Sequence, residues 1–341
     1  MCTYNGARHI REQLESIGKQ SRLPDELVVC DDCSDAADDT REIVADFART
    51  APFPVRLHVN SENIGSTQNF GRAIALCTGD IIALADQDDV WQTHKLETLI
   101  KGFSSSPETG VVFADAYVVD ERLRQSGYTF MQCINFSESE RLLLDGDKSF
   151  ELLVRRGLVA GATMAFRSKY TNLILPMPPN LGVMLHDSWI AIIISAVAKI
   201  KYIDEPLQFY RQHPGQQVGV KVPTEGEIPN RWRRLMTDYL GDIIGDIERL
   251  KIVQGRLSGT GDIYDSEQAK DYVAQRSSHL RVRFSARQLA RAGRIRLVMR
   301  ELLALRYHQH SNGVFSFGKD LLCQRAVQPH KPLRTPPEPI A

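Results

Sequence analysis

Four short runs of apolar, largely β-branched residues recur along the first third of the chain, and they constrain its fold more than any other feature. The runs begin near Leu27, Val55, Ile81 and Val111, at intervals of 28, 26 and 30 residues, and a segment with helical periodicity fills each interval. This rhythm is typical of βαβ units. The runs at Leu27 and Ile81 are apolar without alternation, as in strands that helices cover on both faces. The sequence therefore predicts an α/β fold built on a mainly parallel sheet.

Four amphipathic helices are expected around this sheet, because apolar residues recur at spacings of three and four. Ahead of the first helix, the turn signal Asn5-Gly6 leaves only Met1-Cys2-Thr3-Tyr4 for a strand. Strands average about five or six residues, so we expect the natural start of the chain to lie upstream of Met1. The four apolar stripes are Ile10, Leu14 and Ile17; Ile43, Val44 and Phe47; Phe70, Ala73, Ile74 and Cys77; and Leu96, Leu99, Ile100 and Phe103.

The pattern changes along the rest of the chain. Residues 149–213 mix helical and extended patterns, whereas the periodic segments beyond Gly215 are helical. The end, Val327 to Ala341, holds five prolines in fifteen residues, a composition typical of disorder. We therefore expect a sheet domain over 1–220, a helical extension over 221–326 and a disordered tail over 327–341. The expected elements are helices at Phe150–Arg155, Asp187–Ile200, Trp232–Val253 and Ser278–Tyr307, and extended segments at Val159–Phe166 and Lys201–Ile203.

Composition excludes several classes of protein. Hydrophobic residues make up 43% and charged residues 25%, as in a globular protein, and 42 basic residues balance 42 acidic ones, so nucleic acid is not the expected partner. The six cysteines are scattered and no signal peptide precedes them, which favours reduced thiols in a cytoplasm. The longest apolar run, Trp189 to Ala198, is about half of what a membrane span needs. We expect a cytoplasmic protein without a transmembrane segment.

Acidic residues follow two of the apolar strands directly. Asp31-Asp32 comes after Cys30, and Asp86-Gln87-Asp88-Asp89 comes after Ala85. Ligands of open α/β sheets bind at the carboxyl ends of strands, so both clusters point to one crevice. Carboxylates packed together favour a hard cation such as Mg²⁺ or Mn²⁺. The alternative is that these residues cap the next helix or face water.

A set of short motifs gives this pattern a context. Together they resemble the bacterial family 2 glycosyltransferases of the GT-A fold, including rhamnosyltransferase-like enzymes of polysaccharide biosynthesis. The resemblance covers roughly residues 1–220, with seven motifs in family order. They are Cys2-Thr3-Tyr4-Asn5-Gly6, Val28 to Asp35, Asn63-Ile64-Gly65 with Asn69, Ala85 to Trp91, Gly161 to Phe166, His186-Asp187-Ser188-Trp189, and Tyr210-Arg211-Gln212-His213.

The resemblance implies a site for a nucleotide-sugar donor and an acceptor glycan. It implies that Asp31 holds the base through a ring nitrogen, and that the strand before Thr3 is central in the sheet and therefore mostly missing. It also implies Mg²⁺ or Mn²⁺ as the cofactor. Donor-binding residues would be Thr3, Tyr4, Asn5, Asp31, Asn63, Gly65, Asn69 and Asp86, and metal contacts would be Asp88, Asp86 and His213.

The chemistry of this family needs few groups. A metal stabilises the leaving diphosphate, so no protonated acid is needed there, and one carboxylate on the opposite face suffices to take the proton of the acceptor hydroxyl. Asp187, at the start of an apolar helix, fits the role of this base, and attack opposite the leaving group inverts the anomeric carbon. The alternative is that Asp187 caps that helix.

Three further features have simpler interpretations. Cys30 and Cys33 have the spacing of a redox or zinc pair, but Cys30 lies in a buried strand, so packing is favoured. Trp91 is favoured as a lid or core aromatic over a sugar-stacking platform. Gly161, with the small residues after it, fits either a close approach of the acceptor or a tight turn.

A run of arginines stands out near the end of the chain. Nine arginines fall between positions 276 and 306, against one acid, Glu301. Arg283, Arg287, Arg291 and Arg294 follow one another by four, four and three residues, which predicts a basic amphipathic helix. Such a helix can lie on an anionic membrane, here the inner face of the plasma membrane, or it can pack on acidic groups. We favour the membrane.

The sequence as a whole favours an inverting, metal-dependent glycosyltransferase that acts on a surface polysaccharide or its lipid-linked precursor. One rival is a haloacid-dehalogenase-like phosphatase, because Asp86-Gln87-Asp88-Asp89-Val90 fits its motif with Asp86 as the nucleophile. Against it, two βα units precede that strand. The other rival is a non-catalytic module that binds sugar nucleotides or glycans. The identity of the donor base, the sugar and the acceptor depends on the shape of the pocket.

Overall fold

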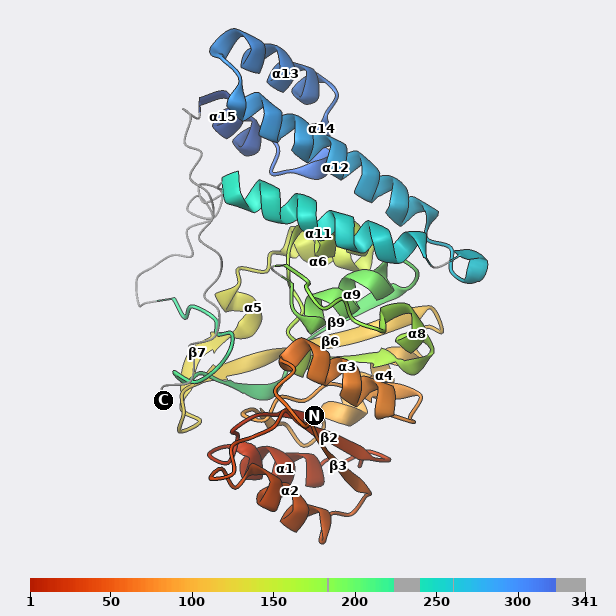
Figure 1. The fold of residues 1–341 in the computed structure, drawn as a ribbon, viewed down its shortest axis with the longest axis vertical. Coiled ribbons are helices and arrows are strands. Elements are labelled where there is room, and N and C mark those ends of the chain that lie inside the picture. Colours follow the sequence, from red (N-terminus) through yellow and green to blue (C-terminus); the bar gives the residue numbers. More distant parts are fainter. Residues whose placement is uncertain (183, 224–239, 260, 323–341) are drawn as a thin grey trace. The chain divides into compact units, whose positions relative to one another are not determined.

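The computed structural model describes residues 1–182, 184–223, 240–259 and 261–322. They fall into two compact units (Figure 1). Unit 1 comprises Met1–Pro229 and Arg256–Ala269, and unit 2 comprises Asn230–Gly255 and Lys270–Ala341. The predicted tail 327–341 and the first part of the helix expected at 232–253 lie outside the described residues.

The first sheet of unit 1 is parallel, with strand order β1-β2-β3. Its strands are β1 Cys2–Thr3, β2 Leu27–Asp31 and β3 Val55–Val59, and β2 is buried along its whole length. The strand before Asn5 has only two residues, as the sequence suggests, but β1 pairs only with β2 and lies at the edge of the sheet. The expectation of a central first strand is therefore wrong for this structure. The helices that follow these strands are α1 Ile10–Gly18, α2 Thr40–Ala48 and α3 Ser66–Leu76, and α1 packs beside α2.

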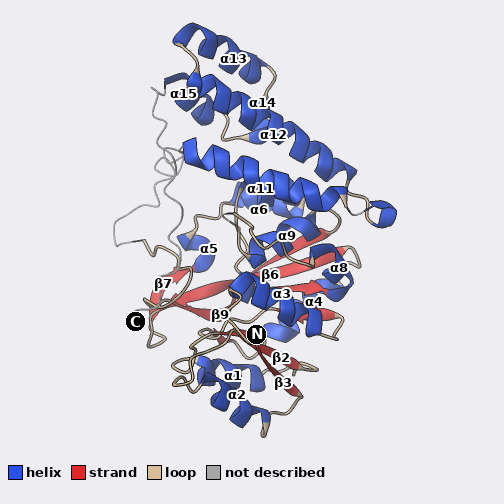
Figure 2. Ribbon diagram, viewed as in Figure 1, coloured by secondary structure: helices blue, strands red, loops and turns tan. Residues whose placement is uncertain are grey.

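The second sheet of unit 1 is mixed (Figure 2). Its order is β4-β8-β6-β9-β5, with β7 paired to β6. Only β6 and β9 are parallel, and the other pairs are antiparallel. The α/β class is thus confirmed, while the parallel pattern holds for the first sheet alone. The strands are β4 Ile81–Ala83, β5 Val90–Trp91, β6 Thr109–Val119, β7 Gln125–Thr129, β8 Met164–Arg167 and β9 Lys199–Arg211.

Helices of unit 1 also accompany the second sheet. The helix expected at 150–155 is present, and the helix expected at 187–200 ends at Ser195, because the chain then enters β9. β9 is much longer than the expected strand at 201–203, since it spans thirteen residues and pairs with β6 from Lys199 to Arg211. The helices are α4 Lys95–Ser104, α5 Phe130–Cys133, α6 Glu138–Asp145, α7 Ser149–Arg155, α8 Thr171–Ile174 and α9 His186–Ser195.

Unit 2 is helical in its described part. Most of α11 Leu240–Ser258 belongs to it, followed by α12 Glu267–Gln288, α13 Arg291–Leu303, α14 Arg306–His310 and α15 Val314–Leu322. Among the described residues, no helix is both long enough and apolar enough to cross a membrane.

The predicted membrane-facing set of arginines is wrong. The expected helix at 278–307 is divided between α12, α13 and α14, and Arg283 and Arg287 are only 3% and 7% exposed. Both pair with the buried Asp320, at 2.7 Å and 2.6 Å from their Nε atoms, and Arg294 is buried as well. Only Arg291 of the four is exposed. Packing on acidic groups, the alternative interpretation, holds for Arg283 and Arg287.

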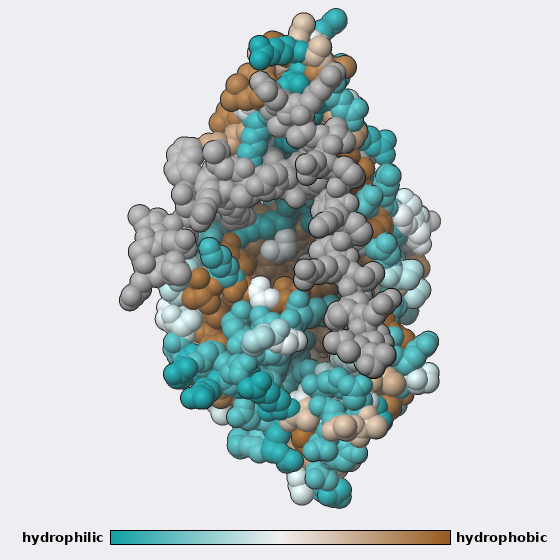
Figure 3. Space-filling view, turned by 60° about the vertical axis from the view of Figure 1, so that its left-hand side comes forward, coloured by the Kyte–Doolittle hydropathy of each residue, from teal (hydrophilic) through white to brown (hydrophobic). Residues whose placement is uncertain are grey.

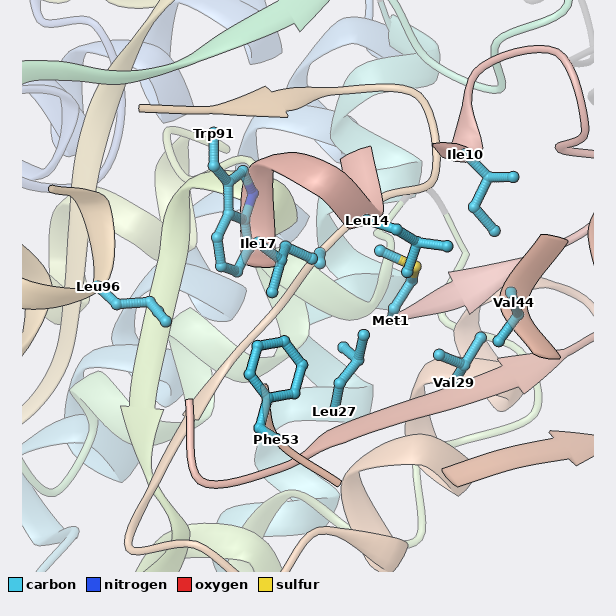
Figure 4. Packing of buried hydrophobic residues seen from close by; sticks show 11 residues of the cluster. Met1, Ile10, Leu14, Ile17, Leu27, Val29, Val44, Phe53, Trp91 and Leu96 are labelled. Carbon is cyan, nitrogen blue, oxygen red and sulfur yellow. The ribbon is translucent and has the colours of Figure 1, made fainter. Parts of the chain in front are cut away.

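The first sheet and its helices share one hydrophobic cluster (Figure 4). The predicted stripe of α1 forms its centre, with Ile10, Leu14 and Ile17 at most 1% exposed. Met1 packs among them, and its amino group donates a hydrogen bond to the backbone oxygen of Val28 at 2.8 Å. The other buried members are Leu27, Val29, Val44, Phe53, Ala85, Trp91 and Leu96.

Leu14→Ala tests how much this cluster contributes to the stability of the fold. Leu14 is 1% exposed, so the substitution should leave a cavity and lower the free energy of unfolding by about 2–5 kcal/mol. Urea denaturation measures the loss. Leu142→Ala is the control, because Leu142 is 67% exposed and should lose about 0.5 kcal/mol or less. Equal losses in the two variants would contradict the cluster's role.

Candidate active site

Three loops of unit 1 meet through side-chain hydrogen bonds, and all three carry predicted site residues. The amide of Gln87 binds the backbone of Tyr4 twice, as acceptor from Tyr4 N at 2.9 Å and as donor to Tyr4 O at 3.0 Å. Asn5 donates from its backbone to Ser34 Oγ and from its side chain to Asp35, at 2.9 Å and 2.8 Å. The structure thus brings together the loops after β1, β2 and β4.

Gln87 also fixes the residue type at position 6. A Cβ atom on Gly6 would lie 2.3 Å from Gln87 Oε1 and 2.6 Å from its Cδ, which is closer than real Cβ atoms approach. Only glycine therefore lets the Gln87 amide lie against the loop after β1. Tyr4, beside it, is 46% exposed and free to contact a ligand, whereas Thr3 is 2% exposed.

Asp31 is enclosed by donors instead of facing a ligand. Its carboxylate is fully buried and accepts hydrogen bonds from Thr3 Oγ1, Arg41 Nε and both the backbone and side chain of Ser34. Burial alone would raise the pKa of Asp31, but the bonds from Ser34, Arg41 and Thr3 hold the pKa below its usual value. The expected contact of Asp31 with a ring nitrogen is not available in this conformation, because both oxygens are already occupied.

Asp32 is the residue of this pair that sequence reasoning missed. Its two oxygens accept hydrogen bonds from the backbone nitrogens of Ile64 and Gly65, each at 2.9 Å, and from the side chain of Asn60. Asp32 thereby holds the loop before α3 next to the end of β2. Asp31 and Asp32 look equivalent in the sequence. Only the contact of Asp32 with the loop before α3 distinguishes their roles.

The predicted donor residues of the loop before α3 divide into two groups. Asn63 and Gly65 are exposed, and Gly65 has a positive φ of 81° that favours glycine. Asn69 is instead 1% exposed, donates to Cys30 O at 2.8 Å and accepts from Asn60 at 3.0 Å. Asn69 therefore supports the loop from beneath through these two hydrogen bonds.

The acidic cluster after β4 concentrates negative charge. Burial and the charges of Asp88 and Asp187 raise the pKa of Asp86 to about 7. Burial and the charges of Asp88 and Asp86 raise the pKa of Asp89 well above its usual value. Asp187, the predicted base, thus contributes to the raised pKa of Asp86.

Asp88 has a histidine partner, as the predicted metal site requires. His213 Nε2 lies 2.8 Å from Asp88 Oδ2, and His9 packs against the His213 ring with centroids 5.1 Å apart. However, no group of three His, Cys, Asp or Glu side chains able to hold a metal exists among the described residues. The predicted trio of Asp86, Asp88 and His213 is therefore not a preformed three-ligand site. Asp88 and His213 offer two ligands, and a ligand diphosphate would have to supply others.

A buried lysine, also missed from the sequence, lies beneath the cluster. Lys95 is fully buried, and its Nζ donates to Ala162 O at 2.6 Å and to Gln208 Oε1 at 2.5 Å. Gln208 Nε2 in turn donates to Asp89 at 2.8 Å. Burial lowers the pKa of Lys95 to about 7, although the charges of Asp89 and Asp86 oppose this. The signal was hidden because Lys95 falls in an amphipathic helix, where a lysine is expected to face solvent.

Arg211 completes the support from the end of β9. Its backbone nitrogen donates to Asp89 at 3.1 Å and its Nε donates to the backbone oxygen of Asp88 at 2.7 Å. Its guanidinium also pairs with Glu12 of α1. Arg211 is 3% exposed, so it acts as an internal brace between the acidic loop and α1.

Asp187 lies in the first turn of α9, one residue past its start. Its Oδ2 accepts from Gly161 N at 3.1 Å and its Oδ1 accepts from Ser188 N at 2.5 Å. The N-cap is Leu185, so Asp187 is not the cap residue itself, although it satisfies a free amide of the first turn. The side chain is partly exposed, as a base must be.

The close approach of His186 leaves no room for a side chain at position 161. A Cβ atom at this position would lie 2.7 Å from His186 Nε2, and the His186 ring stacks on Phe70 with centroids 3.9 Å apart. Gly161 itself is buried, which explains the glycine by close packing and not by an approaching acceptor.

Two simpler interpretations are confirmed. Trp91 is a core residue, 6% exposed, with Lys95 Nζ 4.0 Å from the centre of its ring. Cys30 is fully buried and forms no disulfide, and neither does Cys33.

Comparison with known proteins connects this site to one family. The sequence profile described as "Glycosyl transferase family 2" matches residues 1–169. An uncharacterized glycosyltransferase of Nostoc sp. is 26% identical over 62% of this chain and 63% of its own length. The dTDP-rhamnosyl transferase RfbG of Shigella flexneri is 24% identical over 72% of this chain and 85% of its own. The chain thus spans less than two thirds of the Nostoc relative.

Solved structures agree on the fold. Staphylococcus aureus TarS 1–349 in complex with UDP-GlcNAc superposes with a TM-score of 0.55, at 16% identity, over 94% of this chain and 86% of the other. The match of the profile and the shared fold favour the transferase over the phosphatase that the Asp86 motif also allows. By this match, residues 1–169 of the chain belong to the family described as "Glycosyl transferase family 2".

Proposed function

We propose that this protein is an inverting, metal-dependent glycosyltransferase that moves a sugar from a nucleotide donor to a glycan of the bacterial surface or its lipid-linked precursor. The observation that carries the proposal is the meeting of the three loops, where exposed Tyr4 and Asn5 adjoin the acidic cluster and the charge of Asp187 acts on Asp86. The nucleotide would lie along the loops after β1 and before α3, with the diphosphate toward Asp88.

Asp88 and His213 are the residues that would hold a divalent cation. Their polar atoms already converge within 2.8 Å, and the excess of carboxylates around them favours a positive ion. When bound, the cation would offset the negative charge that develops on the leaving diphosphate. Gln87 would keep the cluster against the nucleotide loop, and Arg211 would hold the backbone of Asp88 in place.

Asp187 would take the proton of the acceptor hydroxyl. Its hydrogen bonds from Gly161 N and Ser188 N fix the carboxylate, and it remains an acceptor in that arrangement. A single base facing the donor implies a single displacement, and therefore inversion at the anomeric carbon.

The printed names of relatives suggest the substrate class. RfbG is a dTDP-rhamnosyl transferase, and a Salmonella typhimurium relative, 23% identical over 49% of each chain, is an abequosyltransferase. Both names refer to deoxysugars, so a deoxyhexose donor is the first to test. Hydrolysis and transfer assays with a panel of nucleotide sugars and Mn²⁺ would test the proposal, and no turnover with any of them would favour a binding module.

Asp88→Asn should abolish cation-dependent donor binding. The amide keeps the size of the side chain but removes the negative charge that attracts a cation. Calorimetric titration of nucleoside diphosphates with and without Mn²⁺ would show the loss of cation dependence. Asp25→Asn is the matched control, since Asp25 is exposed and remote from the three loops along the sheet. Persistent Mn²⁺ dependence in Asp88→Asn would exclude Asp88 as a ligand.

Asp187→Asn should lower turnover by about a hundredfold or more, the usual contribution of a general base. The amide oxygen can still accept from Gly161 N, and only the bond from Ser188 N within α9 is lost, so the affinity for the donor should be unchanged. Steady-state kinetics and donor titration separate the two effects. A loss of donor affinity with normal turnover would make Asp187 a binding residue.

Asp86→Asn should change how stability depends on pH. The raised pKa means that the folded protein keeps the Asp86 proton between about pH 4 and pH 7 while the unfolded chain releases it, so stability falls as pH rises through that window. Asparagine at position 86 does not titrate, so the variant does not lose stability in this way as the pH rises. In chelator, thermal melts should show Asp86→Asn gaining stability over the native protein at pH 8 relative to pH 5. The same difference at both values of pH would contradict the raised pKa.

A further inference from the structure

Unit 2 presents exposed charge of one sign over its last three described helices. The segment from Arg291 to Leu322 contains two acids, Glu301 and Asp320, and both are fully buried. Glu301 pairs with His279 at 2.7 Å and Arg306 at 2.9 Å, and Asp320 pairs with the two arginines of α12. Every exposed charged side chain of this segment is therefore basic.

The surface from Leu289 to Leu322 is also rich in exposed apolar side chains. Eight of the sixteen large hydrophobic side chains that are exposed in the described part of the chain lie between Leu289 and Leu322. Figure 3 shows hydrophobic residues reaching the surface among hydrophilic ones at the top of the view, where these helices lie. The eight are Leu289, Ile295, Met299, Leu303, Leu305, Val314, Phe315 and Leu322.

Helix α13 arranges these residues in an ordered way. Ile295, Met299 and Leu303 follow one another by four residues and so form one stripe, with 48%, 38% and 78% of their surface exposed. The opposite face holds the buried Val298 and Glu301. The stripe therefore points away from the unit's own core.

Arginines border this stripe at its start and along one side. Arg291 lies one turn before Ile295, while Arg296 and Arg300 each follow a stripe residue by one position, which puts them on the neighbouring row. All three are exposed, and no ion pair is found for them within the described residues. An apolar stripe with exposed arginines beside it is the pattern of a helix that lies in the interface of an anionic bilayer.

We propose that the exposed face of α13, formed by Ile295, Met299, Leu303, Arg291, Arg296 and Arg300, docks unit 2 on an anionic lipid surface. The arginines would contact lipid phosphates while the apolar stripe enters the boundary of the acyl chains. A second copy of the chain fits less well, because a symmetric contact over the stripe would bring both sets of arginines together. The proposal is independent of the transfer reaction, since lipid binding is measured without substrates.

Co-sedimentation of the full chain with vesicles tests the charge. The native protein should bind vesicles of phosphatidylcholine with phosphatidylglycerol, should not bind phosphatidylcholine alone, and should release as salt is added. Arg296→Glu with Arg300→Glu should weaken binding by about thirtyfold or more. Arg122→Glu with Arg281→Glu is the matched control, because both arginines are exposed and lie outside α13. This control should bind as the native protein does.

A second variant tests the stripe. Ile295→Ser, Met299→Ser and Leu303→Ser together should weaken vesicle binding by about tenfold or more with all arginines present. Because these side chains are exposed, circular dichroism melts should match those of the native protein. The proposal is overturned if the native protein does not bind anionic vesicles. It is also overturned if the α13 variants, with glutamate or serine, bind as tightly as the native protein. If light scattering instead reveals a native dimer that becomes a monomer in the serine variant, and the native protein also fails to bind vesicles, the stripe is a self-association surface.

Discussion

The structure around the site depends on how the repulsion between Asp86, Asp88 and Asp89 is contained. These acids stand within four residues, and their mutual repulsion and burial raise the pKa of Asp86 and Asp89. Lys95 from below and Arg211 from the side supply the opposing charge and donors. Because one brace comes from α4 and the other from the end of β9, the acidic loop has its shape only once the second sheet is assembled.

Much of unit 1 could be predicted from the sequence because its signals are local. Apolar stripes such as Ile10, Leu14 and Ile17 fixed the helices, and the resemblance of seven motifs pointed to the loops that meet. What could not be predicted depends on pairing between distant segments. Asp31 and Asp32 are adjacent and alike in sequence, yet one is enclosed by Ser34 and Arg41 while the other holds the loop before α3. The mixed second sheet was missed for the same reason.

The arginine-rich region shows a different limit of sequence reasoning. Arg276, Arg283 and Arg287 share one face of α12, but their spacing alone does not tell whether that face is turned inward or toward solvent. The choice is made by Asp320, which is 33 residues beyond Arg287 and 37 beyond Arg283 in the chain. Asp320 pairs with Arg283 and Arg287 in the interior, which leaves Arg291, Arg296 and Arg300 at the surface. Of the four arginines expected at the surface from the sequence, only Arg291 is part of the exposed basic face of α13.

The position of Asp320 has a consequence for how unit 2 is made. Its carboxylate pairs with Arg283 and Arg287 and accepts from the hydroxyl of Tyr307 at 2.8 Å, all in the interior. Burying a guanidinium group without its counter-charge is unfavourable, because breaking a buried ion pair by removing one partner costs roughly 3–5 kcal/mol. During synthesis, the inner face of α12 therefore cannot be buried until α15, which carries Asp320, has also left the ribosome. Unit 2 is consequently expected to fold late and in one step, while unit 1 is free to fold on the growing chain.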